Sequence, residues 1–140
     1  MSRAALLLLV AGCPSSGGLG KGGDDTDTVA AATSFGADVL PILQVNCAIS
    51  GCHAGPELST GLDLTTGQAY HHIVDVPSFQ LATMDLIEPG NPDASYLVRK
   101  VEGSAEAAGG SGDLMPPGFG LPQGDIDVIR QWVTEGALQN

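Results

Sequence analysis

Positive charge is scarce in this sequence. Its 140 residues include 5 lysines and arginines against 16 aspartates and glutamates, so the formal net charge is −11 at pH 7. A nucleic-acid-binding protein neutralises a run of phosphates with basic side chains, and this chain has too few of them for that role. The composition therefore argues against nucleic-acid binding and favours partners that present a basic surface.

Large apolar side chains are scarce as well. Aromatic residues make up 4% of the chain, whereas glycine occurs 20 times. A chain of this length is expected to form one domain, and few large side chains leave it little apolar area to offset the loss of chain entropy on folding. A bound group with a large apolar surface would supply part of such a core.

The N-terminal apolar run, residues 4–10, is too short to cross a bilayer as a helix. It follows Arg3 and leads into two small residues and Cys13, which resembles the lipobox of bacterial lipoproteins. The resemblance implies a signal peptide at residues 1–12 and a lipid on Cys13 as the mature N-terminus. We therefore predict an exported protein, lipid-anchored to a bacterial membrane on its periplasmic or cell-surface side. The alternative is a short hydrophobic helix with a buried cysteine.

Glycine, serine and aspartate dominate the next segment, which has almost nothing to bury. We predict a flexible tether at residues 13–34 and a folded domain at residues 35–140. The aspartates of the tether lack the ligand spacing and the closing glutamate of a calcium loop, so we expect a solvated linker.

Cysteine occurs three times, and the two that remain beside Cys13 are followed directly by a histidine. Cys47 and Cys52 could add their thiols to the vinyl groups of a haem, and the imidazole of His53 could then bind the iron. The usual spacing leaves two residues between the cysteines, whereas this chain has the four residues 48–51. Two other uses stay open. One is a Cys47–Cys52 disulfide, which export would permit, and the other is a zinc site on the same three residues, for which no fourth ligand is evident.

Two segments show clear helical periodicity, and no segment shows clear strand-like alternation. The first runs from a cap at Thr33 or Ser34 into Cys47, and the last follows residues 122–124 and closes at Gly136. Their predicted buried stripes are Phe35, Val39, Ile42 and Leu43 in the first, and Ile126, Ile129, Trp132 and Val133 in the last. The predicted fold class is therefore all-α, with long loops.

Two shorter helices are predicted between them. Thr65 or Thr66 would cap a brief helix at residues 68–74. Asn91 would cap a third helix at residues 92–101, where proline occupies the first position. The whole order is then a helix, the Cys-Cys-His group, loops with short helices, a Met-Pro-Pro group and a terminal helix.

This order resembles a class I cytochrome c, and more closely the cytochrome c-like domains of bacterial exported proteins. The matching pieces are residues 47–53, residues 89–97, Met-Pro-Pro at residues 115–117, and residues 129–137. Together they span about residues 35–138, and the resemblance implies about four short helices with long loops around one covalently bound haem c. It also implies thioether links at Cys47 and Cys52. His53 would be the proximal ligand of the iron and Met115 the distal ligand.

Three other residues compete with Met115 as the distal ligand. Met84 is the other methionine of the predicted mature chain, and His71 and His72 lie in a predicted helix. Met115 is favoured because it lies in a loop rich in glycine and proline, where a methionine that only fills a core is less expected. The long spacing of the cysteines leaves open whether one or both are attached.

The resemblance implies one-electron transfer between redox proteins. With both axial positions of the iron filled, no open site is left for a substrate, so we do not expect an enzyme. The expected contacts are a redox partner with a basic docking face and a membrane through the lipid on Cys13. The alternative is a haem-free exported lipoprotein that acts as an interaction module and is stapled by a Cys47–Cys52 disulfide.

Overall fold

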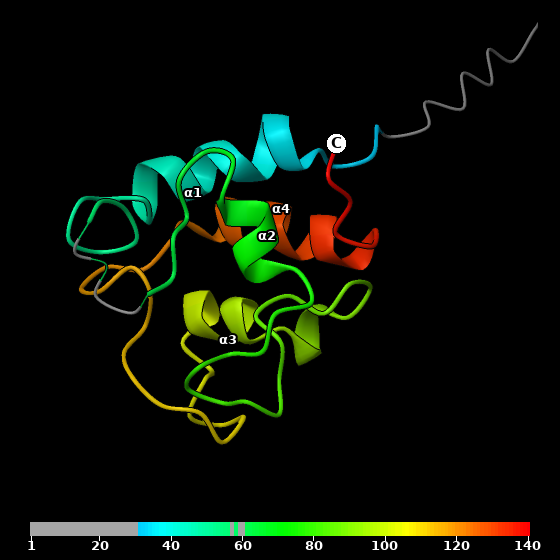
Figure 1. Cartoon of the computed structure of the whole chain (residues 1–140). Coiled ribbons are helices and arrows are strands. Elements are labelled where there is room, and N and C mark those ends of the chain that lie inside the picture. Colours follow the sequence, from blue (N-terminus) through cyan, green and yellow to red (C-terminus); the bar gives the residue numbers. More distant parts are fainter. Residues whose placement is uncertain (1–30, 57, 59–60) are drawn as a thin grey trace, which may run out of the picture.

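The computed structural model describes residues 31–56, 58 and 61–140. In these residues the chain forms four α-helices and two short helices of other types, joined by long loops (Figure 1). They are η1 (Phe35–Val39), α1 (Leu40–Asn46), α2 (Ala69–Ile73), η2 (Pro92–Ala94), α3 (Tyr96–Glu102) and α4 (Gln123–Thr134). The same residues contain isolated β-bridges and no strand, as the all-α prediction requires. The predicted signal peptide and the lipidated Cys13 lie outside the described residues.

The first helical segment is formed by η1 and α1 in direct succession. Ser34 caps it, because its Oγ accepts a hydrogen bond from the N–H of Ala37 at 3.1 Å. Pro41 lies in the first turn of α1, at the junction where the π-helical pattern of η1 gives way to the α-helix. The predicted cap and buried stripe are confirmed, and the helix ends at Asn46, so that Cys47 follows it at once.

The terminal helix α4 is also confirmed, with its four predicted stripe residues buried and Gly136 in the left-handed region just beyond it. Its C-terminal end is tied to the start of η1. The N–H of Gly36 donates to the carbonyl of Asn140 at 2.8 Å, and the N–H of Phe35 donates to the Asn140 side chain at 2.8 Å. The start of η1 therefore lies at the end of α4, and the end of α1 lies toward the start of α4.

The predicted third helix is interrupted, so the prediction of one continuous helix is wrong. Asn91 does cap its first turn, η2, by accepting from the N–H of Ala94 at 3.2 Å. Ser95 is extended, however, because its Oγ donates to the carbonyl of Asn91 at 2.9 Å and accepts from the N–H of Glu88 at 2.9 Å. A buried serine hydroxyl that binds backbone groups competes with helical pairing, so α3 begins anew after it.

The cap predicted for the second helix is also wrong. No side chain caps α2, and Gln68 occupies its N-cap position. The Thr65 hydroxyl instead donates to the Asp63 carboxylate at 2.6 Å, and the N–H of Thr65 donates to the same carboxylate at 2.9 Å. Thr65 therefore belongs to a turn ahead of the helix, and α2 begins later, at Ala69.

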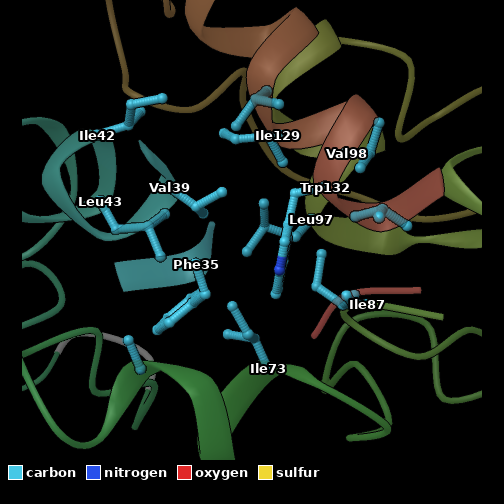
Figure 2. Close-up of a cluster of buried hydrophobic side chains, with 14 of the residues drawn as sticks. Phe35, Val39, Ile42, Leu43, Ile73, Ile87, Leu97, Val98, Ile129 and Trp132 are labelled. Atoms are coloured by element: carbon cyan, nitrogen blue, oxygen red, sulfur yellow. The ribbon is translucent and has the colours of Figure 1, made fainter. Parts of the chain in front are cut away.

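The core lies where η1, α1, α2, α3 and α4 meet (Figure 2). Helix α4 packs between η1 on one side and η2 with α3 on the other. Trp132 and Leu97 fill the centre, and Ile73 closes the core from α2. The ring of Phe35 packs against Trp132 and against Tyr70, with centroids 5.2 Å apart in both pairs. Few aromatic residues are present, and these three are concentrated at one end of the helices.

Candidate functional site

The cysteine loop, residues 47–55, begins where α1 ends. The N–H of Cys47 still donates to Leu43 at 2.9 Å, and the N–H of Cys52 donates to the carbonyl of Ile49 at 2.9 Å, which folds the loop into a turn. Ser50 and Gly51 are exposed at this turn, and Gly51 has a φ of +80° with open space around its α-carbon. The added length between the cysteines is thus placed outward, on the two small residues.

The two cysteines lie in different surroundings. Cys47 is a half-buried free thiol that packs against the core, and burial raises its pKa to about 11. Cys52 is exposed at the surface of the turn. A thiol reacts as its thiolate, so Cys47 is a weak nucleophile in the folded protein.

His53 is held by a backbone carbonyl. Its Nδ1 lies 3.1 Å from the carbonyl oxygen of Leu62, and its own carbonyl accepts from the N–H of Leu64 at 2.9 Å. A carbonyl oxygen only accepts, so this hydrogen bond places the ring proton on Nδ1 and the lone pair on Nε2. Histidines that ligate metals are commonly oriented in this way, by a carbonyl that binds the other ring nitrogen.

Met115 lies in the methionine loop, residues 110–121, which leads into α4. Its side chain is half-buried, and its N–H donates to the carbonyl of Lys100 at 3.0 Å. The N–H of Gly120 donates to the carbonyl of Pro116 at 3.0 Å and closes the turn behind it. The methionine is therefore presented from a loop that is anchored to α3.

The cysteine and methionine loops lie at the same end of the molecule. The first follows the end of α1 and the second precedes the start of α4, and Figure 1 shows both at the left, in blue-green and in orange. This is the end opposite to the one where Asn140 ties η1 to α4.

The competing ligand candidates occupy other positions. Met84 lies in the loop that precedes η2, one residue before Asp85, whose carbonyl accepts from the N–H of Tyr96 at the start of α3. His71 is exposed on α2, where its ring meets that of Tyr70 edge-on at 5.7 Å. His72 has its Nδ1 3.1 Å from the carbonyl of Asp63. His72 and His53 thus bind neighbouring carbonyls of one segment.

Most of the exposed large apolar side chains lie close along the chain to the proposed haem residues. Among the described residues, six large hydrophobic side chains are exposed: Val45, Ile49, Phe79, Leu114, Phe119 and Leu138. Four of the six lie within four residues of Cys47 or Met115 along the chain. Val45 is 74% exposed and Phe119 is 83% exposed. An apolar ligand at this end would have side chains to contact.

Two cavities are found in the described part of the chain, and the second borders the methionine loop at Gly112 and Leu114. One of about 220 Å³ lies between Phe35, Tyr70 and Asn140, and another of about 230 Å³ lies beside Lys100 and Leu114. Neither is lined by the proposed haem residues. No group of three or more histidine, cysteine or acidic side chains in the described residues is arranged to hold a metal ion, and the zinc interpretation therefore gains no support.

The donor chemistry fits a haem. Two cysteines directly precede an imidazole whose tautomer leaves the lone pair on Nε2, and a half-buried thioether is supplied by the loop at the same end of the helices. The sequence pattern identified these residue types. The sequence pattern did not reveal the Leu62 carbonyl that orients His53, because a residue of any type can supply a backbone acceptor.

The described residues include no helix with the length and apolar character needed to cross a membrane. A scan of protein-family models, a search of curated proteins and a search of solved structures each gave no match to this chain.

Proposed function

We propose that this protein is an exported, lipid-anchored c-type cytochrome that transfers single electrons through one haem c. The observation that carries the proposal is the hydrogen bond from His53 Nδ1 to the Leu62 carbonyl, on a histidine that directly follows two cysteines. Histidines that bind iron are commonly held in this way, with the second ring nitrogen hydrogen-bonded to a carbonyl, and His53 combines this bond with its place directly after Cys52. His53 is therefore the proximal ligand in this proposal.

Each of the other residues has a separate role. Cys47 and Cys52 hold the haem covalently. The thioether of Cys47 lies at the edge of the core, and that of Cys52 lies at the surface. Met115 supplies the distal ligand from the methionine loop. A haem held between an imidazole and a thioether supplies a one-electron couple with a raised potential. The apolar side chains of Val45, Ile49 and the methionine loop limit the access of water to it.

Charge supports a basic partner. The cationic side chains of residues 31–140 that the structure describes are Arg99, Lys100 and Arg130, all on α3 and α4, and each is engaged with an oxygen of the protein itself. The cysteine and methionine loops contain no lysine or arginine. A partner that carries basic side chains can approach this end without repulsion. The lipid on Cys13 would hold the protein at a membrane, and with both axial positions filled no substrate site is proposed.

An absorption spectrum tests the proposal directly. Full-length protein, produced in a bacterial host that attaches haem c, should show the sharp bands of a low-spin haem and keep its colour after denaturation and acid–acetone extraction. The pyridine haemochrome spectrum separates one thioether from two, because a remaining vinyl group shifts the α-band to longer wavelength. The matched control is Cys47→Ser with Cys52→Ser, which should lose the colour on extraction. Colourless wild-type protein with a Cys47–Cys52 disulfide would overturn the proposal in favour of the haem-free interaction module.

A further inference from the structure

We propose that Tyr96 and Lys100 of α3 are positioning residues, which fix the methionine loop so that Met115 is held at the haem iron. This inference rests on the proposed function and deepens it, since it names side chains that act on the ligand through its loop. Both residues are buried: Tyr96 is 1% exposed and Lys100 is 7% exposed. A lysine is rarely buried to this degree unless its ammonium group has a fixed partner.

The partner is the backbone of Ser111. Lys100 Nζ donates to the carbonyl of Ser111 at 3.1 Å. The hydroxyl oxygen of Tyr96 accepts from the N–H of Ser111 at 3.1 Å and lies 3.0 Å from the same carbonyl, which it can bind as a donor. Two side chains of one helix therefore hold both polar backbone groups of a single loop residue.

The residues on either side of Ser111 permit this close approach. A Cβ on Gly110 would lie 2.5 Å from the ring and the hydroxyl of Tyr96. A Cβ on Gly112 would lie 2.9 Å from the Gln80 side chain and 3.0 Å from Lys100 Nζ, at a φ of +81°. Only glycine leaves the room that the backbone needs to reach the two side chains. The Gly-Ser-Gly sequence is thus explained by the contact with α3.

A second anchor lies four residues further along. The N–H of Met115 donates to the carbonyl of Lys100 at 3.0 Å, so the same lysine holds the loop by its side chain and by its backbone. Between the anchors, the side chain of Leu114 packs against the backbone at Gly103 and Gly120. The three residues 112–114 that join Ser111 to Met115 therefore have both ends fixed to one helix, and a short, doubly anchored segment has little freedom to move.

The burial of Lys100 distinguishes this role from ordinary packing. Loss of the ammonium group also removes the cost of its desolvation, which offsets the lost hydrogen bond in the stability of the whole fold. Lys100→Met should therefore keep the global stability and lose only the hold on Ser111. If Lys100 served only to stabilise the fold, its replacement would lower the free energy of unfolding of the whole protein and would not act on the methionine loop alone.

Amide hydrogen exchange tests the anchors whether or not haem is bound. We expect Lys100→Met and Tyr96→Phe to speed exchange at Ser111 by about tenfold, the effect of losing one ordinary hydrogen bond, and to speed it at Met115 by less, because the bond of that amide to the Lys100 carbonyl remains. Amides of α4 such as that of Ile129 should be unchanged. The matched control is Arg99→Met on the same helix, because the Arg99 side chain binds the carbonyl of Asp93, away from the methionine loop. Equal acceleration in the loop and in α4, or none in either, would overturn the proposal.

The second readout is the ligand itself. In the haem-loaded protein both variants should weaken the near-infrared band of sulfur-to-iron ligation and bind carbon monoxide faster in the ferrous state, with Arg99→Met unchanged. Variants that loosen the loop but keep the wild-type band and carbon monoxide kinetics would show that Tyr96 and Lys100 hold the loop without positioning the ligand. That result overturns this inference alone. A wild-type protein that never takes up haem overturns the proposed function and the ligand role together.

Discussion

The two ends of the helical framework differ in the kinds of side chain that they hold. At the closed end, formed by η1, the end of α4 and residues 136–140, the rings of Phe35, Tyr70 and Trp132 pack together. The hydroxyl of Tyr70 also donates to the carbonyl of Ala137 at 2.9 Å. At the loop end, formed by the cysteine and methionine loops, large apolar side chains such as Phe119 lie in the open. The aromatic rings thus pack at one end, and the side chains with donor chemistry lie in loops at the other.

The residues with donor chemistry and the residues that pack the core lie at different ends of the molecule. The side chains with donor chemistry, Cys47, His53 and Met115, are all at the loop end, whereas the rings of Phe35, Tyr70 and Trp132 pack together at the closed end. Loops on a rigid framework are where functional residues are usually found. We therefore expect substitutions at the closed end to change folding, and substitutions at the loop end to change ligand binding with little effect on folding of the haem-free chain.

The largest expected effect is on stability, at the closed end. Trp132→Ala removes a fully buried ring, and loss of such a side chain costs about 3–5 kcal/mol of the free energy of unfolding. The matched substitution at the loop end is Phe119→Ala, which should change that free energy by less than about 0.5 kcal/mol. Urea denaturation of the haem-free protein, followed by circular dichroism, measures both. Similar losses in the two variants would remove the distinction between the ends.

The next effect concerns the haem at the loop end. Met115→Ala should open the distal position to carbon monoxide, and Met115→His should keep a six-coordinate low-spin iron but lower its potential, because imidazole is a harder and more basic donor than a thioether. The near-infrared sulfur-to-iron band should disappear in both variants and persist in the control Met84→Leu. A band that survives Met115→Ala assigns the ligand to Met84. If the wild type lacks the band, His71 or His72 becomes the candidate.

Periodicity made the closed end predictable from the sequence. The buried stripes around Phe35 and Trp132, the cap at Ser34 and the end of α4 near Gly136 all follow from local patterns, and the structure has them. The break at Ser95 was not predictable in this way. It depends on a hydroxyl that binds the backbone of Asn91 and Glu88, and such pairing is decided by tertiary contacts.

At the loop end the sequence indicated residue types but not their surroundings. The Cys-Cys-His group and Met115 were identified from chemistry and resemblance. The carbonyl that orients His53 and the burial of Lys100 were not, because loops lack a periodic pattern that shows which side faces inward. The glycines at 110 and 112 were the available signal for Lys100, since glycine on both sides of one residue indicates a close approach of the backbone.

A third prediction concerns the reactivity of the two thiols in the cysteine loop. Cys47 packs against the core and Cys52 is exposed, so iodoacetamide should label Cys52 first in the folded haem-free protein. With a pKa raised to about 11, Cys47 is almost wholly protonated at pH 8, and its rate of reaction should keep rising with pH until it levels off near pH 11. Peptide mass spectrometry of the Cys13→Ser chain measures the two rates.

Labelling in urea provides the control, because both thiols should then react at similar rates. Equal rates in the folded protein would contradict the half-buried position of Cys47. Failure of both cysteines to react until a reductant is added would instead indicate the disulfide of the alternative function.

The smallest expected effect is at the ion pairs that join α4 to η2 and α3, between the two ends. Arg130 contacts Asp93 at 2.8 Å and Glu102 at 2.7 Å, and its hydrogen bond lowers the pKa of the Asp93 carboxyl below the ordinary value. A carboxyl with a lowered pKa in the folded state stabilises that state at pH values above its unfolded pKa, and this contribution is lost as the pH falls through the folded pKa. Asp93 is largely exposed, so solvent and salt screen the pair and the contribution is small.

Arg130→Met should therefore be slightly less stable than the wild type at pH 7, and the difference should shrink in acid and in high salt. Urea denaturation at pH 7 and at pH 3 measures it, with Gln131→Met as the exposed control on the same helix. A difference that stays the same in acid and in high salt would show that Arg130 acts by packing of its aliphatic stem, and the ion pairs would then have no part in holding α4 to α3.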